Sequence, residues 1–160
     1  MNAGAVARPA TLLLPLLLVL GACGSGAVDV AGDPPAAEDR EACRSLLDDV
    51  PDTVADLPAR AVTPADGWGA AWGDPAIVLR CGVDLPEGFD AVAACTTVNG
   101  VDWYLPDTPP EDEGAVTITT VHREPLVELR LPSEHWPPAA AMVDLAGTVR
   151  EHTDRTGRCL

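Results

Sequence analysis

The alternation of apolar and polar positions predicts a β-strand over residues 76–83. Because successive side chains of a strand point to opposite faces, two sets of residues separate. One face carries Ile77, Leu79, Cys81 and Val83, and the other carries Ala76, Val78 and Arg80. A cysteine among large apolar residues favours an inward disulfide over an exposed thiol. Residues 72–75 (Trp-Gly-Asp-Pro) predict a turn before the strand, because Gly permits positive φ and Pro fixes φ.

Two hairpins follow the central strand. Asn99-Gly100 between the β-rich runs 95–98 and 101–105 is the strongest short-range signal for a type I′ turn. Residues 115–121 and 126–131 predict a second antiparallel pair, with one apolar and one solvent-facing side.

Helical spacing of apolar residues appears near both ends of the remaining chain. Residues 38–49 repeat apolar positions at helical spacing until Pro51 ends the pattern. A second apolar stripe runs to about His152, in a helix that we expect to begin at Ser133. These elements predict an α+β fold: a small two-layer sandwich, with an antiparallel or mixed sheet and the N-terminal and C-terminal helices on one face.

The first residues are typical of an export signal. Arg8 precedes the short apolar run 12–20, and small residues follow, so we expect residues 1–22 to be a signal peptide. Leu20-Gly21-Ala22-Cys23 is similar to the lipobox of bacterial lipoproteins, which implies diacylglycerol and palmitate on Cys23. An ordinary secreted protein is the alternative. We expect residues 23–37 to form a flexible tether and residues 38–160 a single domain, on the extracytoplasmic side of the cell membrane.

The formal net charge of −15 limits the partners. All ten basic residues are arginines, and removal of Arg8 with the signal makes the chain more acidic. Such a chain is repelled by nucleic acid and by anionic head groups, so we expect no nucleic-acid partner. Membrane contact then depends on the lipid anchor rather than on a basic patch.

Four cysteines remain when Cys23 is set aside. They are Cys43, Cys81, Cys95 and Cys159. An even number in an exported chain predicts two disulfides, for which the count alone allows three connectivities.

The sequence carries no recognisable catalytic motif. Ser25, Ser45 and Ser133 lie outside any Gly-x-Ser-x-Gly elbow. His122, His135 and His152 lack zinc-site spacing, and surface or capping roles are favoured for them. We therefore expect no cofactor, no metal and no catalytic residue.

Three segments resemble the DUF3515 family of exported actinobacterial proteins and lipoproteins. They are residues 71–83 (Ala-Trp-Gly-Asp-Pro-Ala-Ile-Val-Leu-Arg-Cys-Gly-Val), 98–103 (Val-Asn-Gly-Val-Asp-Trp) and 123–128 (Arg-Glu-Pro-Leu-Val-Glu). The resemblance covers roughly residues 38–153 and implies a location in the cell envelope without an assigned chemistry. It also implies the pairings Cys43–Cys81 and Cys95–Cys159.

The leading functional hypothesis is a non-catalytic binding or accessory lipoprotein at the outer face of the cytoplasmic membrane. Its partner would be an envelope protein or a cell-wall component. Trp72, Asp74, Arg80 and Arg123 are candidate ligand-binding residues, because an aromatic ring with arginines can hold an anionic or sugar-like ligand. Their alternative role is turn and salt-bridge structure. Two further hypotheses are an enzyme acting on envelope glycans or peptides, which needs a deep pocket, and a structural spacer.

Overall fold

The computed structural model describes Met1 and residues 26–90, 93–105 and 114–159. Residues 2–22 of the expected signal peptide, Cys23 and residues 106–113 lie outside the described residues.

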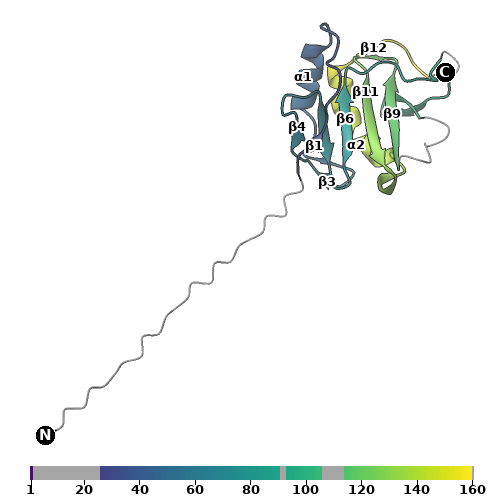
Figure 1. Ribbon diagram of the computed structural model, residues 1–160. Coiled ribbons are helices and arrows are strands. Elements are labelled where there is room, and N and C mark those ends of the chain that lie inside the picture. Colours follow the sequence, from purple (N-terminus) through teal and green to yellow (C-terminus); the bar gives the residue numbers. More distant parts are fainter. Residues whose placement is uncertain (2–25, 91–92, 106–113, 160) are drawn as a thin grey trace.

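The described chain is built on one six-stranded sheet (Figure 1). Its strand order is β5-β6-β11-β9-β8-β7, and every neighbouring pair is antiparallel. The strands are β5 (Gly69–Trp72), β6 (Ile77–Cys81), β7 (Thr96–Val98), β8 (Val101–Tyr104), β9 (Ala115–Val121) and β11 (Val127–Pro132).

The central strand β6 has the predicted faces. Ile77, Leu79 and Cys81 are buried, and Leu79 lies opposite Leu129 of β11. Arg80 on the other face lies opposite Glu128. The period-two alternation of the sequence therefore separates a core face from an outer face.

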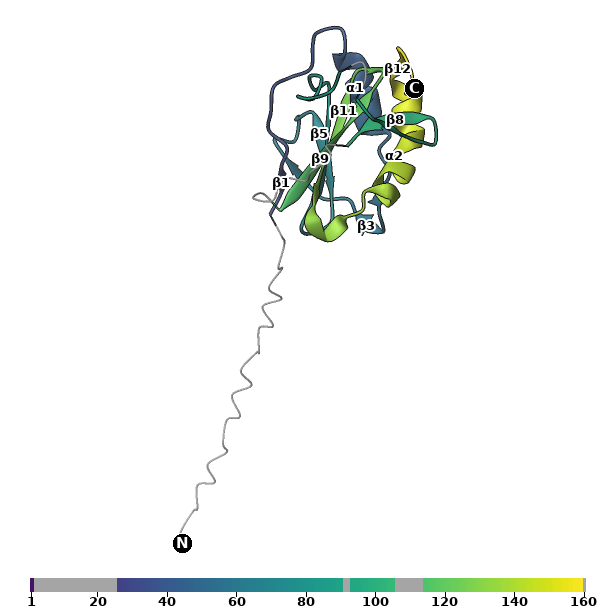
Figure 2. The ribbon, with the colours of Figure 1, turned by 90° about the vertical axis from the view of Figure 1, so that its right-hand side faces the viewer.

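Both helices cover the core face of the sheet (Figure 2). Helix α1 (Arg40–Asp48) contacts β6, and helix α2 (Ala139–His152) contacts α1, β7 and β8. One apolar core joins the inward residues of the sheet to Leu46 of α1 and Leu145 of α2. The expected two-layer α+β sandwich is confirmed.

The last helix begins later than the sequence pattern predicted. Ser133–His135 form a short 3₁₀ helix, η1, and α2 starts only at Ala139. The prediction of a start at Ser133 was wrong because Pro137 and Pro138 intervene. A residue before proline is disfavoured in the α region, and proline supplies no amide donor.

The predicted Asn-Gly hairpin is present between β7 and β8. Asn99 and Gly100 both have positive φ, 47° and 82°, as a type I′ turn requires. The second predicted pair is β9 with β11, and the short strand β10 (Arg123–Glu124) between them pairs with β12 (Asp154–Arg155).

The chain before α1 packs on the domain instead of hanging free. Strand β1 (Val28–Asp29) pairs in parallel with β4 (Val62–Thr63), and Val30 is only 3% exposed. Pro35 is buried against Gly82. The folded part therefore begins before Glu38, within the segment expected to be a tether. A further small hairpin joins β2 (Thr53–Val54) to β3 (Leu57–Pro58).

Two disulfides close the fold, with the pairings that the family resemblance implied. Cys43–Cys81 links α1 to β6 across the core. Cys95, the residue before β7, is linked to Cys159 in the C-terminal segment. The inward disulfide expected at Cys81 is confirmed.

Candidate functional site

Trp72 is a core residue. Its side chain is 0% exposed, and its Nε1 donates a hydrogen bond to the Pro51 carbonyl at 2.8 Å. Asp74 follows in the exposed turn between β5 and β6, where its carboxylate lies 4.0 Å from the Arg60 guanidinium. One candidate side chain therefore faces the core and its neighbour faces solvent.

Arg80 lies on the outer face of the sheet. Its guanidinium is 3.4 Å from the Glu128 carboxylate, in agreement with the alternative salt-bridge role of Arg80. A Cβ added at Gly32 would overlap this guanidinium, which shows how closely the N-terminal segment covers it. The glycine thus leaves room for the Arg80–Glu128 pair.

Arg123 is buried in the short strand β10, which pairs with β12. One guanidinium nitrogen donates to the Thr153 carbonyl (3.0 Å) and hydroxyl (3.1 Å), and the other donates to the Gly100 carbonyl (3.0 Å). Burial lowers the pKa of Arg123 from its usual value, Arg155 lowers it further, and the Asp102 carboxylate acts in the opposite direction. The side chain thus links the β7–β8 turn to the end of α2.

These four candidates do not form one site. Among the described residues, no hydrogen bond or ion pair joins any two of them. Arg80 and Arg123 line two hollows that adjoin each other. Trp72 lines a separate hollow beside Arg44 and Arg60.

The surface features of the domain lie at two opposite ends, which we call proximal and distal. The proximal end, where the continuously described chain begins, consists of Gly26, the 73–76 turn and residues 133–137. Arg60 fixes Gly26 to this turn by donating to the carbonyls of Gly26 (3.0 Å) and Gly73 (2.6 Å). The distal end lies where β6 finishes and β11 begins, because these two strands are antiparallel.

Three adjoining hollows mark the distal end among the described residues. The first, of about 380 Å³, lies beside Arg80, and the second, of about 480 Å³, lies beside Arg123. They share Asp39, Val83 and Asp84. The third, of about 360 Å³, shares Glu124 with the second. The shared walls make one continuous hollowed surface.

The second hollow has an apolar and aromatic wall. Leu85, 55% exposed, lies in it beside Phe89 and His122. The Phe89 ring meets the rings of Tyr104 and His122 edge-on, with centroids 5.5 and 5.8 Å apart. Side chains from three separate loops and strands therefore build one surface that is suitable for an apolar group of a partner.

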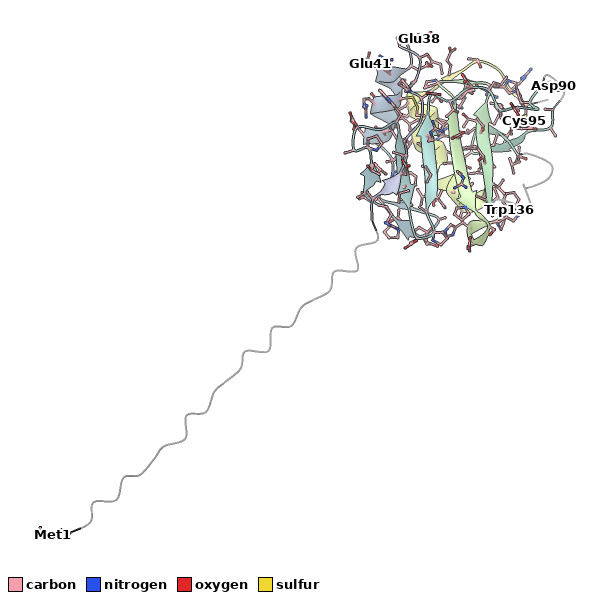
Figure 3. The ribbon with its side chains drawn as sticks, in the orientation of Figure 1. Met1, Glu38, Glu41, Asp90, Cys95 and Trp136 are labelled. Atoms are coloured by element: carbon pink, nitrogen blue, oxygen red, sulfur yellow. A yellow bond between two sulfur atoms is a disulfide. The ribbon has the colours of Figure 1, made fainter. Side chains whose placement is uncertain are left out.

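Carboxylates dominate the three hollows. Their acidic lining residues are Asp33, Glu38, Asp39, Glu41, Asp84, Glu124, Glu128, Glu151 and Asp154. Arg80 and Arg123 are the arginines among the same lining residues. Figure 3 shows Glu38 and Glu41 projecting at this end, away from Trp136. The distal end therefore favours a cationic partner.

One group beside the third hollow has potential metal ligands. Single ligand atoms of Asp49, Glu151 and His152 lie within 4.8 Å of one another. His152 Nε2 already lies 2.7 Å from the Asp49 carboxylate, so this contact accounts for both groups as an ion pair or hydrogen bond. Sequence spacing gave no sign of the group because α1 and α2 bring its members together.

The sequence analysis missed most residues of the hollows for the same reason. Leu85 and Phe89 belong to an irregular segment without periodicity, and the acidic residues are scattered over the chain. Only Arg80 and Arg123 were singled out, and the sign of the net charge was the remaining signal.

These features define the class of protein: a small disulfide-bonded α+β domain with an acidic, hollowed end. The model of the DUF3515 family, described as a protein of unknown function, matches residues 6–157 of the 160. The chain belongs to this family. No curated protein and no solved structure matches it. Among the described residues, no helix has the length and apolar character needed to cross a membrane.

Proposed function

We propose that this chain is an exported lipoprotein, anchored through Cys23 at the outer face of the cytoplasmic membrane. There it acts as a non-catalytic accessory module that binds a partner protein of the envelope. One observation carries the proposal. The continuously described chain begins with Gly26 at the proximal end, whereas the three joined hollows lie at the distal end.

The position of Cys23 just before Gly26 determines which end of the domain would face the membrane. An anchor at Cys23 holds the proximal end toward the membrane, since only Gly24 and Ser25 separate Cys23 from Gly26. The distal end then faces the envelope. Acidic residues around the Leu85 and Phe89 wall suit a partner segment that combines basic and apolar side chains.

The enzyme hypothesis receives no specific support from the arrangement of the described side chains. His122 packs against Phe89, His135 contacts the Pro75 carbonyl, and His152 contacts Asp49. All four cysteines of the domain are in disulfides. No described histidine therefore contacts a serine hydroxyl or a thiol that it would activate.

In-cell photo-crosslinking tests the proposed function. A photo-reactive amino acid replaces Leu85 at the distal end of the full-length protein, and captured proteins are identified by mass spectrometry. The matched control carries the same amino acid at Val143, which is 47% exposed on α2. We expect one dominant envelope protein from Leu85 and not from Val143.

The same experiment with Cys23→Ala tests the anchor. We expect this variant to leave the membrane fraction and to lose the captured protein. Capture that is equal from Leu85 and Val143, or of cell-wall glycan alone, would contradict the proposed protein partner. A Cys23→Ala protein that stays with the membrane would contradict the anchor.

A further inference from the structure

We infer that the proximal end rests on the lipid bilayer and that the Trp136 ring enters the interface between head groups and acyl chains. This inference rests on the proposed anchor at Cys23. It adds a second membrane contact, made by the folded domain itself.

The chain between anchor and domain is too short to hold the proximal end away from the membrane. An extended chain spans at most about 3.6 Å per residue, so Gly26 lies within about 11 Å of Cys23. Arg60 binds the carbonyls of both Gly26 and Gly73, which fixes the start of the described chain to the β5–β6 turn. The turn must therefore approach the bilayer with Gly26.

A second contact brings Trp136 to the same place. His135 Nε2 lies 2.7 Å from the carbonyl of Pro75 in the β5–β6 turn, and Trp136 is the next residue. The Trp136 side chain is 44% exposed (Figure 3). Pro137, the next residue, and Pro75, which His135 contacts, are also exposed. An exposed aromatic ring thus lies at the end that the anchor brings to the membrane.

Tryptophan suits this position chemically. Its amphipathic ring is enriched at membrane–water interfaces, where the ring body meets the acyl chains and the indole N–H meets the head groups. Asp74 and Glu134 are exposed at the same end, and their charges remain at head-group level. They oppose deeper insertion, so the contact is a shallow one driven by the ring and not by attraction to anionic lipid.

Fluorescence quenching by brominated lipid tests the contact. Protein extracted from membranes, with its modification at Cys23 read by mass spectrometry, is reconstituted into phosphatidylcholine vesicles that carry bromine on the acyl chains. Trp72 and Trp103 are fully buried. Trp68 is partly buried under the Arg44 guanidinium, and its carbonyl accepts from the amide of Cys81 at the distal end of β6. Strong quenching that depends on Trp136 therefore reports a ring at the proximal end in the membrane. We expect the emission of the unsubstituted protein to fall and that of Trp136→Phe to stay nearly unchanged.

A matched variant reports on the opposite end. Trp136→Phe combined with Leu85→Trp moves the exposed indole to the distal end, where we expect no quenching. A lipid-modified protein that is quenched equally with and without Trp136, or as strongly from position 85, overturns the membrane contact alone. An unmodified Cys23 overturns the proposed anchor, and the contact that depends on it falls with it.

Discussion

At the scale of single residues, Arg123 shows how a candidate ligand-binding arginine is used inside the fold. Its guanidinium donates to acceptors on Gly100 and Thr153, which belong to the β7–β8 turn and to the end of α2. The desolvated charge is satisfied by these carbonyl and hydroxyl oxygens. We therefore interpret Arg123 as a structural link at the floor of the second hollow.

This interpretation predicts a large loss of stability for Arg123→Met. The buried carbonyl and hydroxyl of Thr153 and the part-buried carbonyl of Gly100 would lose their donor. We expect the free energy of unfolding to fall by about 2–4 kcal/mol. Urea unfolding followed by circular dichroism measures the change.

Arg150 provides the matched control for this substitution. It donates to the Asn99 carbonyl of the same turn at 2.9 Å, but from an exposed position. We expect Arg150→Met to change the free energy of unfolding by no more than about 0.5 kcal/mol. Equal losses from the two variants would mean that burial of Arg123 contributes nothing.

At the scale of elements, the segment 26–35 behaves as part of the domain. Val30 is buried beside Gly67 and Gly69, where an added Cβ would contact it closely. Asp29 accepts a hydrogen bond from the amide of Ala31, which shapes the chain after β1. The glycines of β5 and the loop before it thus make room for the segment.

Val30→Ala tests this packing. Removal of two buried methyl groups predicts a loss of about 1–3 kcal/mol in the free energy of unfolding, measured by urea titration. The same substitution at the exposed Val143 of α2 is the control. It removes little buried surface and introduces a better helix former, so we expect a change near zero. A silent Val30→Ala would show that the segment does not stabilise the domain.

Elements with strong local patterns were predictable from the sequence, and elements fixed by distant contacts were not. The alternation in β6 and the Asn99-Gly100 turn each depend on residues close in sequence, and both are confirmed. The docking of β1 depends on β4, more than thirty residues away by the pairing of Val28 with Val62. The segment around β1 also contains Gly and Pro residues that are typical of linkers. Its composition therefore predicted a flexible tether rather than a docked strand.

The hollowed surface escaped prediction for a related reason. Its walls come from the loop after β6, the β9–β11 connection and both helices. Periodicity reports which face of an element is buried, but it does not report which loops meet. The lining residues were therefore visible only as an excess of negative charge.

The two disulfides predict an order of reduction. Cys43 is 0% and Cys81 2% exposed, whereas Cys95 and Cys159 are both partly exposed. Because thiol–disulfide exchange needs access to sulfur, we expect mild reductant to open Cys95–Cys159 first. Alkylation at increasing times followed by peptide mapping measures the order. Simultaneous labelling of all four cysteines under native conditions would contradict it.

At the scale of the whole molecule, two ends with different chemistry are the main feature. The proximal end carries Gly26 and an exposed Trp136, and the distal end carries joined acidic hollows. The formal net charge is −15, and among the ion pairs of the described residues Glu128 is the one acidic residue of these hollows with a partner, Arg80. Mutual repulsion then opposes the compact state at low ionic strength.

Salt should therefore stabilise the protein through screening. Between about 0.01 M and about 0.15 M salt the Debye length falls from roughly 30 Å to about 8 Å, so repulsion across the distal end weakens. We expect the midpoint of urea unfolding to rise over this range, and to rise equally in sodium chloride and in choline chloride.

Calcium chloride at matched ionic strength separates screening from binding. An extra rise that disappears in Glu151→Gln would reveal a cation held near Asp49 and His152, whereas equal curves in all three salts leave screening as the whole effect. A midpoint that is independent of salt would contradict the repulsion itself.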